Sequence, residues 1–319
     1  MFKNLYTESE LWHDNSMLLV NMMKRYLILA MILMLPLPVS GMTNVAVEQP
    51  EKFNRLYRLV RKHYSEAELR ELFSSPDVAE MEEKTDRNLK FLLNPLSIKR
   101  QKDQHQKAFD RDIDRKFIDK GLRFFEEHRE VFEETHHRFR VQPADIIAIL
   151  NSESSLGSIT GSQKIIQLFI GQYFLWEEYI EAFEREGAFG RKGAMTKAQA
   201  LKRGRRLEKS ALYNLAALLN QAQEKNFDPV EIRGSRAGAI GYPQFMPASM
   251  RFALDGDGDG RIDLFSMPDA IVSIANFLAE HKYRERGREY SFRRYNPDST
   301  YVRGIKKHSD MLKEAGVKI

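Results

Sequence analysis

Apolar residues recur at intervals of three and four from residue 43 onward, which predicts a mainly helical protein. Ser65 followed by Glu68 has the pattern of a capping box and predicts a helix start. The helix before it places four apolar residues on one face: Phe53, Leu56, Leu59 and Val60. Longer periodic stretches predict helices over 118–139, 165–184, 196–225 and 268–280, and a shorter one over 247–254.

The N-terminus has the pattern of an export signal. Lys24 and Arg25 precede an apolar run over 27–35, and small residues follow near Ser40. The apolar run is short for a membrane span. We therefore interpret residues 1–42 as an export signal with an upstream extension, and the alternative is an uncleaved membrane anchor.

Beyond this segment the chain divides into two predicted parts. Residues 43–100 are strongly charged, and we expect them to form a helical arm without chemistry of its own, packed on the main domain. Residues 101–319 hold the candidate functional residues, and we expect them to form that main domain. No Gly/Ser-rich linker separates the two parts.

Composition narrows the possible chemistry. The chain of 319 residues has no cysteine, which excludes disulfides, cysteine nucleophiles, thiolate metal sites and a lipid anchor on an N-terminal cysteine. The net charge of +5 suits an anionic partner such as a cell-wall polymer, a nucleic acid or a phospholipid surface. A nucleic-acid partner is supported by nothing except the net charge, so we set that class of function aside.

The stretch Pro143–Gly157 contains the strongest candidate for a catalytic residue. Proline suits the first turn of a helix and glycine suits its end. Three residues predict its apolar face: Ile146, Ile149 and Leu150. Glu153 falls on the same face, where burial would raise its pKa and keep it protonated near neutral pH, as a general acid requires. The alternative is a glutamate at a fraying helix end that points into water.

The stretch Arg233–Ser249 differs in composition from the helices around it. It is rich in glycine, alanine and serine, and it also carries the amide of Gln244 beside the aromatic rings of Tyr242 and Phe245. Glycines allow close approach of the backbone, and an amide both donates and accepts hydrogen bonds. Such a loop suits a polar ligand, although many tight turns have a similar composition.

The sequence DGDGDGRID, which begins at residue 255, has the spacing of a calcium loop. Ligands are expected at its positions 1, 3, 5 and 7, which are Asp255, Asp257, Asp259 and the carbonyl of Arg261. Position 12 is Ser266 instead of the usual glutamate, so Asp269 is the candidate for the last ligand. Its alternative role is that of an acid at a helix start. We expect a structural Ca²⁺ site and no organic cofactor.

These residues together resemble the membrane-bound lytic transglycosylase B family of bacterial peptidoglycan enzymes, over about residues 115–310. Four features match in order: Glu-Ser-x-x-Gly at Glu153–Gly157, GSxAGAxGYxQFMPxS at Gly234–Ser249, the calcium-type loop followed by Asp269–Ile271, and Tyr-Asn-x4-Tyr at Tyr295–Tyr301. Two departures are Leu156, where an aromatic residue is usual, and Pro243, where a glycine is usual. The family's lipidated cysteine is also missing.

The resemblance implies a mainly α (α+β), lysozyme-like fold with one catalytic carboxylic acid, Glu153. It further implies two sets of ligand-binding residues. Those that would contact the glycan are Ser235, Gln244, Phe245, Tyr295, Asn296 and Tyr301. Those that would hold the cation are Asp255, Asp257, Asp259, Arg261 and Asp269.

The implied reaction cleaves the bond between N-acetylmuramic acid and N-acetylglucosamine without water and leaves a 1,6-anhydro end. The alternatives are a muramidase-type hydrolase and a non-catalytic, calcium-stabilised protein that binds the cell wall. The expected protein is a periplasmic monomer that acts on peptidoglycan strands, with cell-wall synthesis or secretion complexes as candidate partners.

Overall fold

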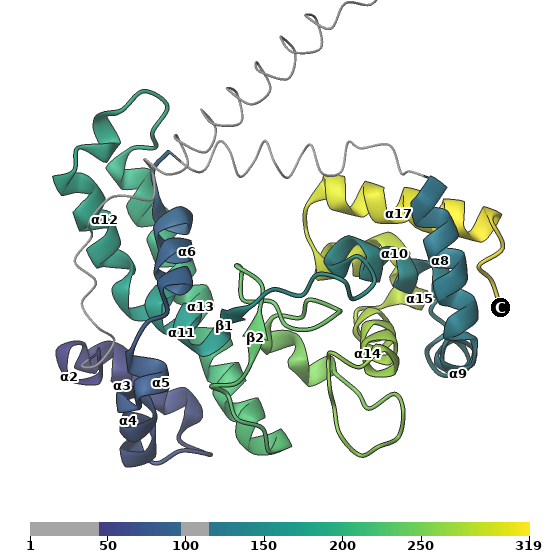
Figure 1. Cartoon of the computed structure of the whole chain (residues 1–319), viewed down its shortest axis with the longest axis horizontal. Helices are drawn as coiled ribbons and strands as arrows, with labels where there is room; N and C mark the ends of the chain where they lie inside the picture. Colours follow the sequence, from purple (N-terminus) through teal and green to yellow (C-terminus); the bar gives the residue numbers. More distant parts are fainter. Residues whose placement is uncertain (1–44, 97–114) are drawn as a thin grey trace, which may run out of the picture. The chain divides into compact units, whose positions relative to one another are not determined.

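The computed structural model describes residues 45–96 and 115–319, which lie within one compact unit, Gly41–Ile319. The predicted export signal lies outside the described residues. In the described part the chain is mainly helical, and its one sheet is a two-stranded antiparallel pair of β1 (Gln163–Lys164) and β2 (Arg233–Gly234) (Figure 1). No helix in these two ranges is both long enough and apolar enough to span a membrane. The predicted boundary between arm and main domain stays a prediction.

The arm consists of five helices in the described residues. They are α2 (Val45–Glu48), α3 (Pro50–Val60), α4 (Glu66–Ser74), α5 (Pro76–Ala79) and α6 (Glu83–Leu93) (Figure 1). The predicted capping box at the start of α4 is confirmed, because Ser65 and Glu68 each bond the other's backbone N–H. Leu59 is 41% exposed while Phe53, Leu56 and Val60 are buried, so the predicted apolar face of α3 was wrong at this one residue.

The arm packs against a group of central helices through α3, α5 and α6. These helices are α11 (Ile165–Ile170), the π-helical turn η2 (Gly171–Leu175), α12 (Trp176–Arg185), the 3-10 turn η3 (Ala188–Gly190) and α13 (Lys197–Lys225). A Cβ at Gly204 would lie 1.9 Å from the Trp176 ring, so this glycine lets α12 and α13 approach closely. The sequence pattern over 165–184 does not distinguish the π-helical turn from ordinary α-helix.

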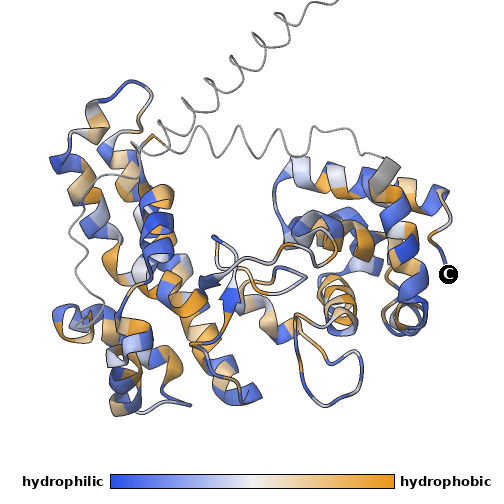
Figure 2. Cartoon of the chain, viewed as in Figure 1, coloured by the Kyte–Doolittle hydropathy of each residue, from blue (hydrophilic) through white to orange (hydrophobic). Residues whose placement is uncertain are grey.

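The remaining helices include α10 (Pro143–Ser154). The others are α8 (Arg115–Glu127), α9 (Arg129–Phe139), the 3-10 helix η4 (Pro247–Phe252), α14 (Met267–Glu280), α15 (Tyr283–Arg286), α16 (Arg288–Tyr295) and α17 (Ser299–Glu314). Since α8, α14 and α17 all contact α10, its first eight residues are buried on every side. Apolar residues dominate the neighbouring α14 as well (Figure 2). The prediction of one helix over 118–139 was wrong, because the chain breaks at His128 between α8 and α9.

Candidate functional site

Glu153 lies in the last turn of α10, where the helix is sharply terminated. Ser155 and Leu156 both adopt left-handed backbone conformations, with φ of 52° and 55°. Their N–H groups donate to the carbonyls of Asn151 and Leu150, which satisfies two acceptors at the helix end. Glu153 is therefore held in regular helix, and its position is set by the packing of α10 instead of by a loop.

Glu153 is partly exposed as a residue, but its carboxyl group is largely desolvated. Burial raises its pKa from the ordinary value to about 7, and a hydrogen bond from Tyr301 opposes that rise. The Tyr301 hydroxyl donates to Glu153 Oε1 at 2.7 Å, and Tyr301 itself is only 2% exposed. A carboxyl group with this pKa exists in both protonation states near neutral pH, which is what acid–base catalysis requires.

A second tyrosine lies in the same environment. The Tyr295 hydroxyl donates to the carbonyl of Pro243 at 2.5 Å, and its ring contacts Phe245 and Phe277. Burial, together with the negative charge of Glu153, holds the pKa of Tyr295 well above its usual range. The tyrosine is therefore a neutral hydrogen-bonding group at any physiological pH.

The other predicted glycan-binding residues differ in burial and in hydrogen-bond partners. Ser235 Oγ accepts from Ala239 N at 3.1 Å, which closes the turn that carries it. Gln244 has a left-handed φ of 50°, and its side-chain amide donates to the carbonyl of Thr160 at 3.3 Å. Phe245 is only 2% exposed, so its ring packs beneath Tyr295 and is not itself part of the surface.

Asn296 occupies the turn between α16 and α17. Its Oδ1 accepts from Asp298 N at 3.0 Å, and Asp298 in turn caps the start of α17 through Tyr301 N. Asn296 thus stabilises the turn that precedes Tyr301, whose hydroxyl donates to Glu153. The structure records no direct bond between Asn296 or Ser235 and Glu153.

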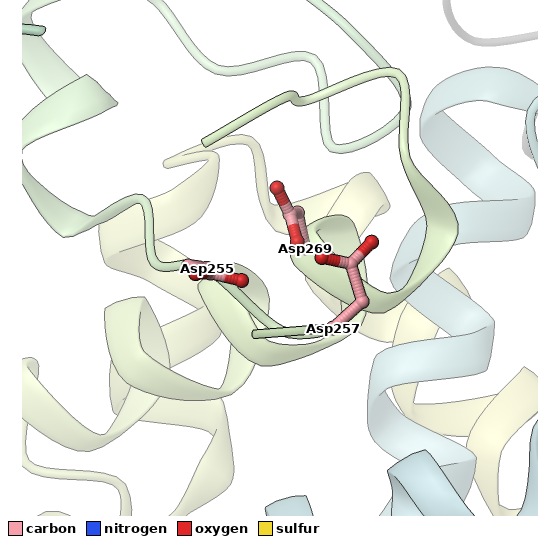
Figure 3. Close-up of side chains that lie close together, drawn as sticks. All are labelled: Asp255, Asp257 and Asp269. Carbon is pink, nitrogen blue, oxygen red and sulfur yellow. The ribbon is translucent and has the colours of Figure 1, made fainter. Parts of the chain in front are cut away.

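Three of the predicted cation ligands come together in the structure. Carboxylate oxygens of Asp255, Asp257 and Asp269 all lie within 4.8 Å of one another (Figure 3). Asp255 accepts from Gly258 N and Gly260 N, which curls the loop around its carboxylate. The loop geometry therefore gathers hard oxygen ligands of the kind that Ca²⁺ prefers.

Asp269 is the buried member of this cluster. Burial raises its pKa, and the charges of Asp257 and Asp255 add to the rise, while bonds from Gly256 N and Asp263 N oppose it. The remaining predicted ligand side chain, that of Asp259, accepts from the N–H of Arg261 at 2.7 Å and stands outside the cluster. Mutual repulsion of three carboxylates is the condition that a bound divalent cation relieves.

The family of the chain follows from its similarity to known proteins. The family described as "Transglycosylase SLT domain" matches residues 50–318. The chain belongs to this family. The resemblance found in the motifs is thereby confirmed, and the match extends further, because it includes most of the arm.

One curated relative matches part of this transglycosylase-family chain. Membrane-bound lytic murein transglycosylase B of Escherichia coli (strain K12) is 27% identical over 165 residues. The match covers 51% of this chain and 38% of the relative, so the chain spans less than half of that relative's length.

Two solved structures share the fold. The E. coli lytic transglycosylase SLT35 in complex with calcium has a TM-score of 0.61 at 19% identity, covering 88% of this chain and 98% of that one. SltB3 of Pseudomonas aeruginosa in complex with NAG-NAM-pentapeptide has a TM-score of 0.57 at 16% identity, covering 85% and 81%. The predicted mainly helical, lysozyme-like fold is confirmed.

This member of the transglycosylase SLT domain family also has a buried acid that sequence reasoning missed. Asp145, in the first turn of α10, is fully buried and accepts from the hydroxyls of Tyr283 and Ser309. Arg288 Nη1 lies 3.2 Å and Lys313 Nζ 3.7 Å from its Oδ1. An acid in a first helical turn is ordinary, so only the partners from α15, α16 and α17 reveal its role.

Proposed function

We propose that the chain is a periplasmic lytic transglycosylase that cleaves the β-1,4 bond between N-acetylmuramic acid and N-acetylglucosamine in peptidoglycan. The observation that carries this proposal is the desolvated Glu153 with its pKa raised to about 7 and its hydrogen bond from Tyr301. Membership of the transglycosylase SLT domain family supports the same reaction class.

In the first step Glu153 acts as a general acid. Tyr301 donates to Oε1, so the proton is carried on Oε2, from which it passes to the bridging oxygen between the two sugars. The bond from C1 of the muramic residue to that oxygen then breaks through an oxocarbenium-like state. Neutral Tyr301 remains bonded to the carboxylate that this transfer leaves behind and stabilises its charge.

In the second step the ionised Glu153 acts as a base. It takes the proton from the C6 hydroxyl of the muramic residue while that oxygen attacks C1, which closes a 1,6-anhydro ring. The proton that Glu153 gave to the leaving sugar is thus replaced, and no water is consumed. Because the sugar supplies its own nucleophile, a second carboxylate of the kind that glycoside hydrolases use is unnecessary.

Glycan binding is assigned, in this proposal, to the residues around Glu153. Ser235 and Gln244 would contribute polar contacts from the Arg233–Ser249 loop, and Tyr295 and Asn296 would contact the reacting sugar. Phe245 would act from below by fixing the ring of Tyr295, which it contacts at a centroid distance of 5.8 Å.

The loop at Asp255 is proposed to hold a structural Ca²⁺ ion. Asp255, Asp257 and Asp269 would supply side-chain ligands, in line with their mutual proximity. The Asp259 side chain and the Arg261 carbonyl would complete the shell. The ion would neutralise the clustered charge and tie the loop to the start of α14, with no part in bond cleavage.

Product analysis tests the proposal. Purified peptidoglycan is digested with the wild-type protein, with Glu153→Gln and with Glu130→Gln, which alters an exposed glutamate of α9. We expect anhydro-muropeptides from the wild type and from Glu130→Gln, and a loss of at least a hundredfold with Glu153→Gln. Reducing-end products would instead identify a hydrolase. Glycan binding without turnover by the wild type would identify a wall-binding protein.

A further inference from the structure

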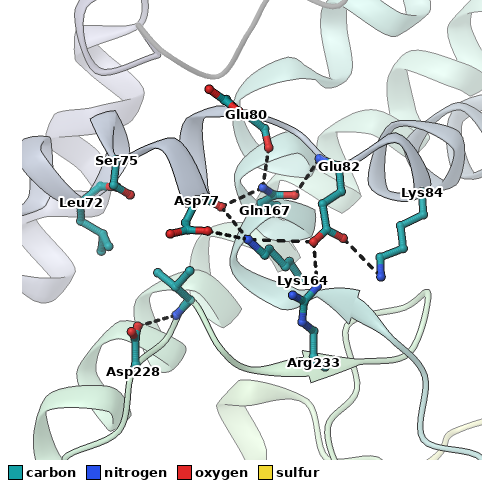
Figure 4. Close-up of polar contacts among 11 residues, drawn as sticks. Leu72, Ser75, Asp77, Glu80, Glu82, Lys84, Lys164, Gln167, Asp228 and Arg233 are labelled. Atoms are coloured by element: carbon teal, nitrogen blue, oxygen red, sulfur yellow. Dashed lines mark hydrogen bonds and ion pairs between the residues drawn. The ribbon is translucent and has the colours of Figure 1, made fainter.

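The arm contacts the candidate glycan-binding loop through two polar side chains. Glu82 Oε1 lies 2.8 Å from Nη1 of Arg233, and the Asn88 side-chain amide donates to the carbonyl of Arg236 at 2.7 Å (Figure 4 shows the Glu82 contacts). Only Gly234 and Ser235 separate the two held points. The arm therefore holds the side chain of Arg233 and the backbone of Arg236, one on each side of Ser235, and we call Glu82 and Asn88 the arm clamp.

The arm also holds the strand on the opposite side of this loop. Lys164 in β1 lies 3.1 Å from Asp77 Oδ1 and 3.9 Å from Glu82 Oε1. The Gln167 amide donates to the carbonyls of Asp77 and Glu80 and accepts from Glu82 N (Figure 4). Both strands of the β1–β2 pair are thus bonded to the same short segment of the arm.

This strand pair connects directly to the catalytic helix. A Cβ at Gly161 would lie 2.3 Å from the Gly234 carbonyl oxygen, so the chain leaving α10 lies directly against the loop. At the preceding residue, the carbonyl of Thr160 accepts a hydrogen bond from the side-chain amide of Gln244. Displacing β1 or β2 therefore changes where Ser235 and Gln244 lie relative to Glu153.

We infer that the arm clamp is a positioning device for substrate: Glu82 and Asn88 hold the Ser235 turn in the conformation that binds the glycan strand. This inference rests on the proposed function. It gives the arm, which was predicted to carry no chemistry, a part in substrate binding, although Glu82 and Asn88 themselves touch no substrate.

The charge state of Glu82 suits this role. Burial acts to raise its pKa, but Arg233 and Lys84 outweigh that effect and hold the pKa below the ordinary value. Glu82 is therefore an ionised acceptor throughout the neutral range. A charge-assisted bond to Arg233 is stronger and geometrically more selective than a neutral one.

The test measures binding apart from turnover. Glu153→Gln serves as the non-cleaving background, and calorimetry gives its Kd for a tetrasaccharide of alternating N-acetylglucosamine and N-acetylmuramic acid. Adding Glu82→Gln or Asn88→Ala should raise Kd about three- to tenfold at a temperature well below unfolding. In the wild-type background the same changes should raise KM by a similar factor and leave kcat within about twofold.

A matched control separates positioning from simple loss of an ion pair. Glu177→Gln removes the carboxylate that bonds Lys52 at 3.0 Å, which is also a contact between the arm and the central helices but does not reach the Ser235 turn. This variant should leave Kd unchanged. Amide hydrogen exchange should be faster at residues 233–240 in Glu82→Gln than in Glu177→Gln.

The outcomes are distinguishable. Unchanged Kd in folded Glu82→Gln and Asn88→Ala, or an equal rise in Glu177→Gln, would overturn the clamp while leaving the proposed function intact. The double variant Glu82→Gln with Arg233→Gln provides a further test. If it loses no more affinity for the glycan than Glu82→Gln alone, Glu82 and Arg233 are directly coupled. No glycan binding by Glu153→Gln together with no cleavage by the wild type would remove the proposed function, and the clamp with it.

Discussion

At the scale of single residues, Glu153 shows how a fold can adjust an acid without any charged partner. Its pKa rises because burial penalises the carboxylate, and the one recorded opposing influence is the neutral hydroxyl of Tyr301. A positive neighbour would lower the pKa and disable the acid, whereas a neutral donor stabilises the ionised form only in part. Both protonation states therefore remain accessible near neutral pH.

This desolvation should be measurable as pH-dependent stability. The folded-state pKa of Glu153, about 7, exceeds the unfolded value of 4.5, so the folded protein binds the extra proton between these limits. Its stabilising contribution is complete below pH 4.5 and is lost as pH rises through 7. Glu153→Gln, which never ionises, should therefore gain stability relative to wild type as pH rises, by up to about 3 kcal/mol at pH 8.

Urea unfolding of both proteins at pH 5 and pH 8 checks this expectation. The difference in unfolding free energy between variant and wild type should be larger at pH 8. A difference that stays constant with pH would mean that Glu153 is well solvated, which would contradict its assignment as the acid.

The position of Glu153 follows from sequence alone, but its partner does not. Helical spacing places it on the apolar face of the 143–157 segment, and α10 is observed there. Tyr301 lies 148 positions further along, and no local pattern connects the two residues. Only the resemblance suggested that Tyr301 is nearby, because contacts between distant segments depend on how helices pack.

At the scale of elements, the cation loop shows both the reach and the limits of spacing rules. The alternation of aspartates predicts the site, and three predicted ligands gather within 4.8 Å. The usual glutamate ligand at position 12 is absent, because this position is Ser266, whose hydroxyl donates to Asp257 at 3.2 Å. Asp269 lies in the carboxylate cluster instead. Asp269 belongs to the first turn of α14, so the loop and that helix form one unit.

Removal of the proposed Ca²⁺ ion should therefore lower the free energy of unfolding. At a hundredfold excess of Ca²⁺ over Kd, binding to the folded state contributes about 2.7 kcal/mol. Chelation should then lower Tm by roughly 4–5 °C for a protein of this size. Asp257→Ala should abolish the difference between Ca²⁺ and chelator, whereas Glu130→Ala, which removes an equal charge from α9, should preserve it. Equal Tm values for the wild type with Ca²⁺ and with chelator would argue against the site.

At the scale of the whole described molecule, buried and part-buried polar contacts connect segments that the sequence presents as independent helices. The arm is bonded to the β1–β2 pair, and α10 is bonded to α15, α16 and α17 through Asp145. Periodicity identifies which residues are apolar and so predicts most helices. It does not identify buried polar residues such as Asp145, because their positions break the pattern that the prediction relies on.

The Asp145 network makes the strongest stability prediction. Asp145 is fully buried, and its removal would leave Arg288 and Lys313 without their internal acid. Breaking a buried ion pair by deleting one partner typically costs 3–5 kcal/mol, so Asp145→Ala should lose roughly that amount in urea unfolding. Asp310, which also bonds Arg288, is 43% exposed, so Asp310→Ala should cost under about 1 kcal/mol.

Since α10 carries Glu153 and α17 carries Tyr301, Asp145→Ala should also lower the rate of glycan cleavage at temperatures where the variant is still folded. Equal losses of stability for the two variants would show that the network contributes no more than a surface ion pair.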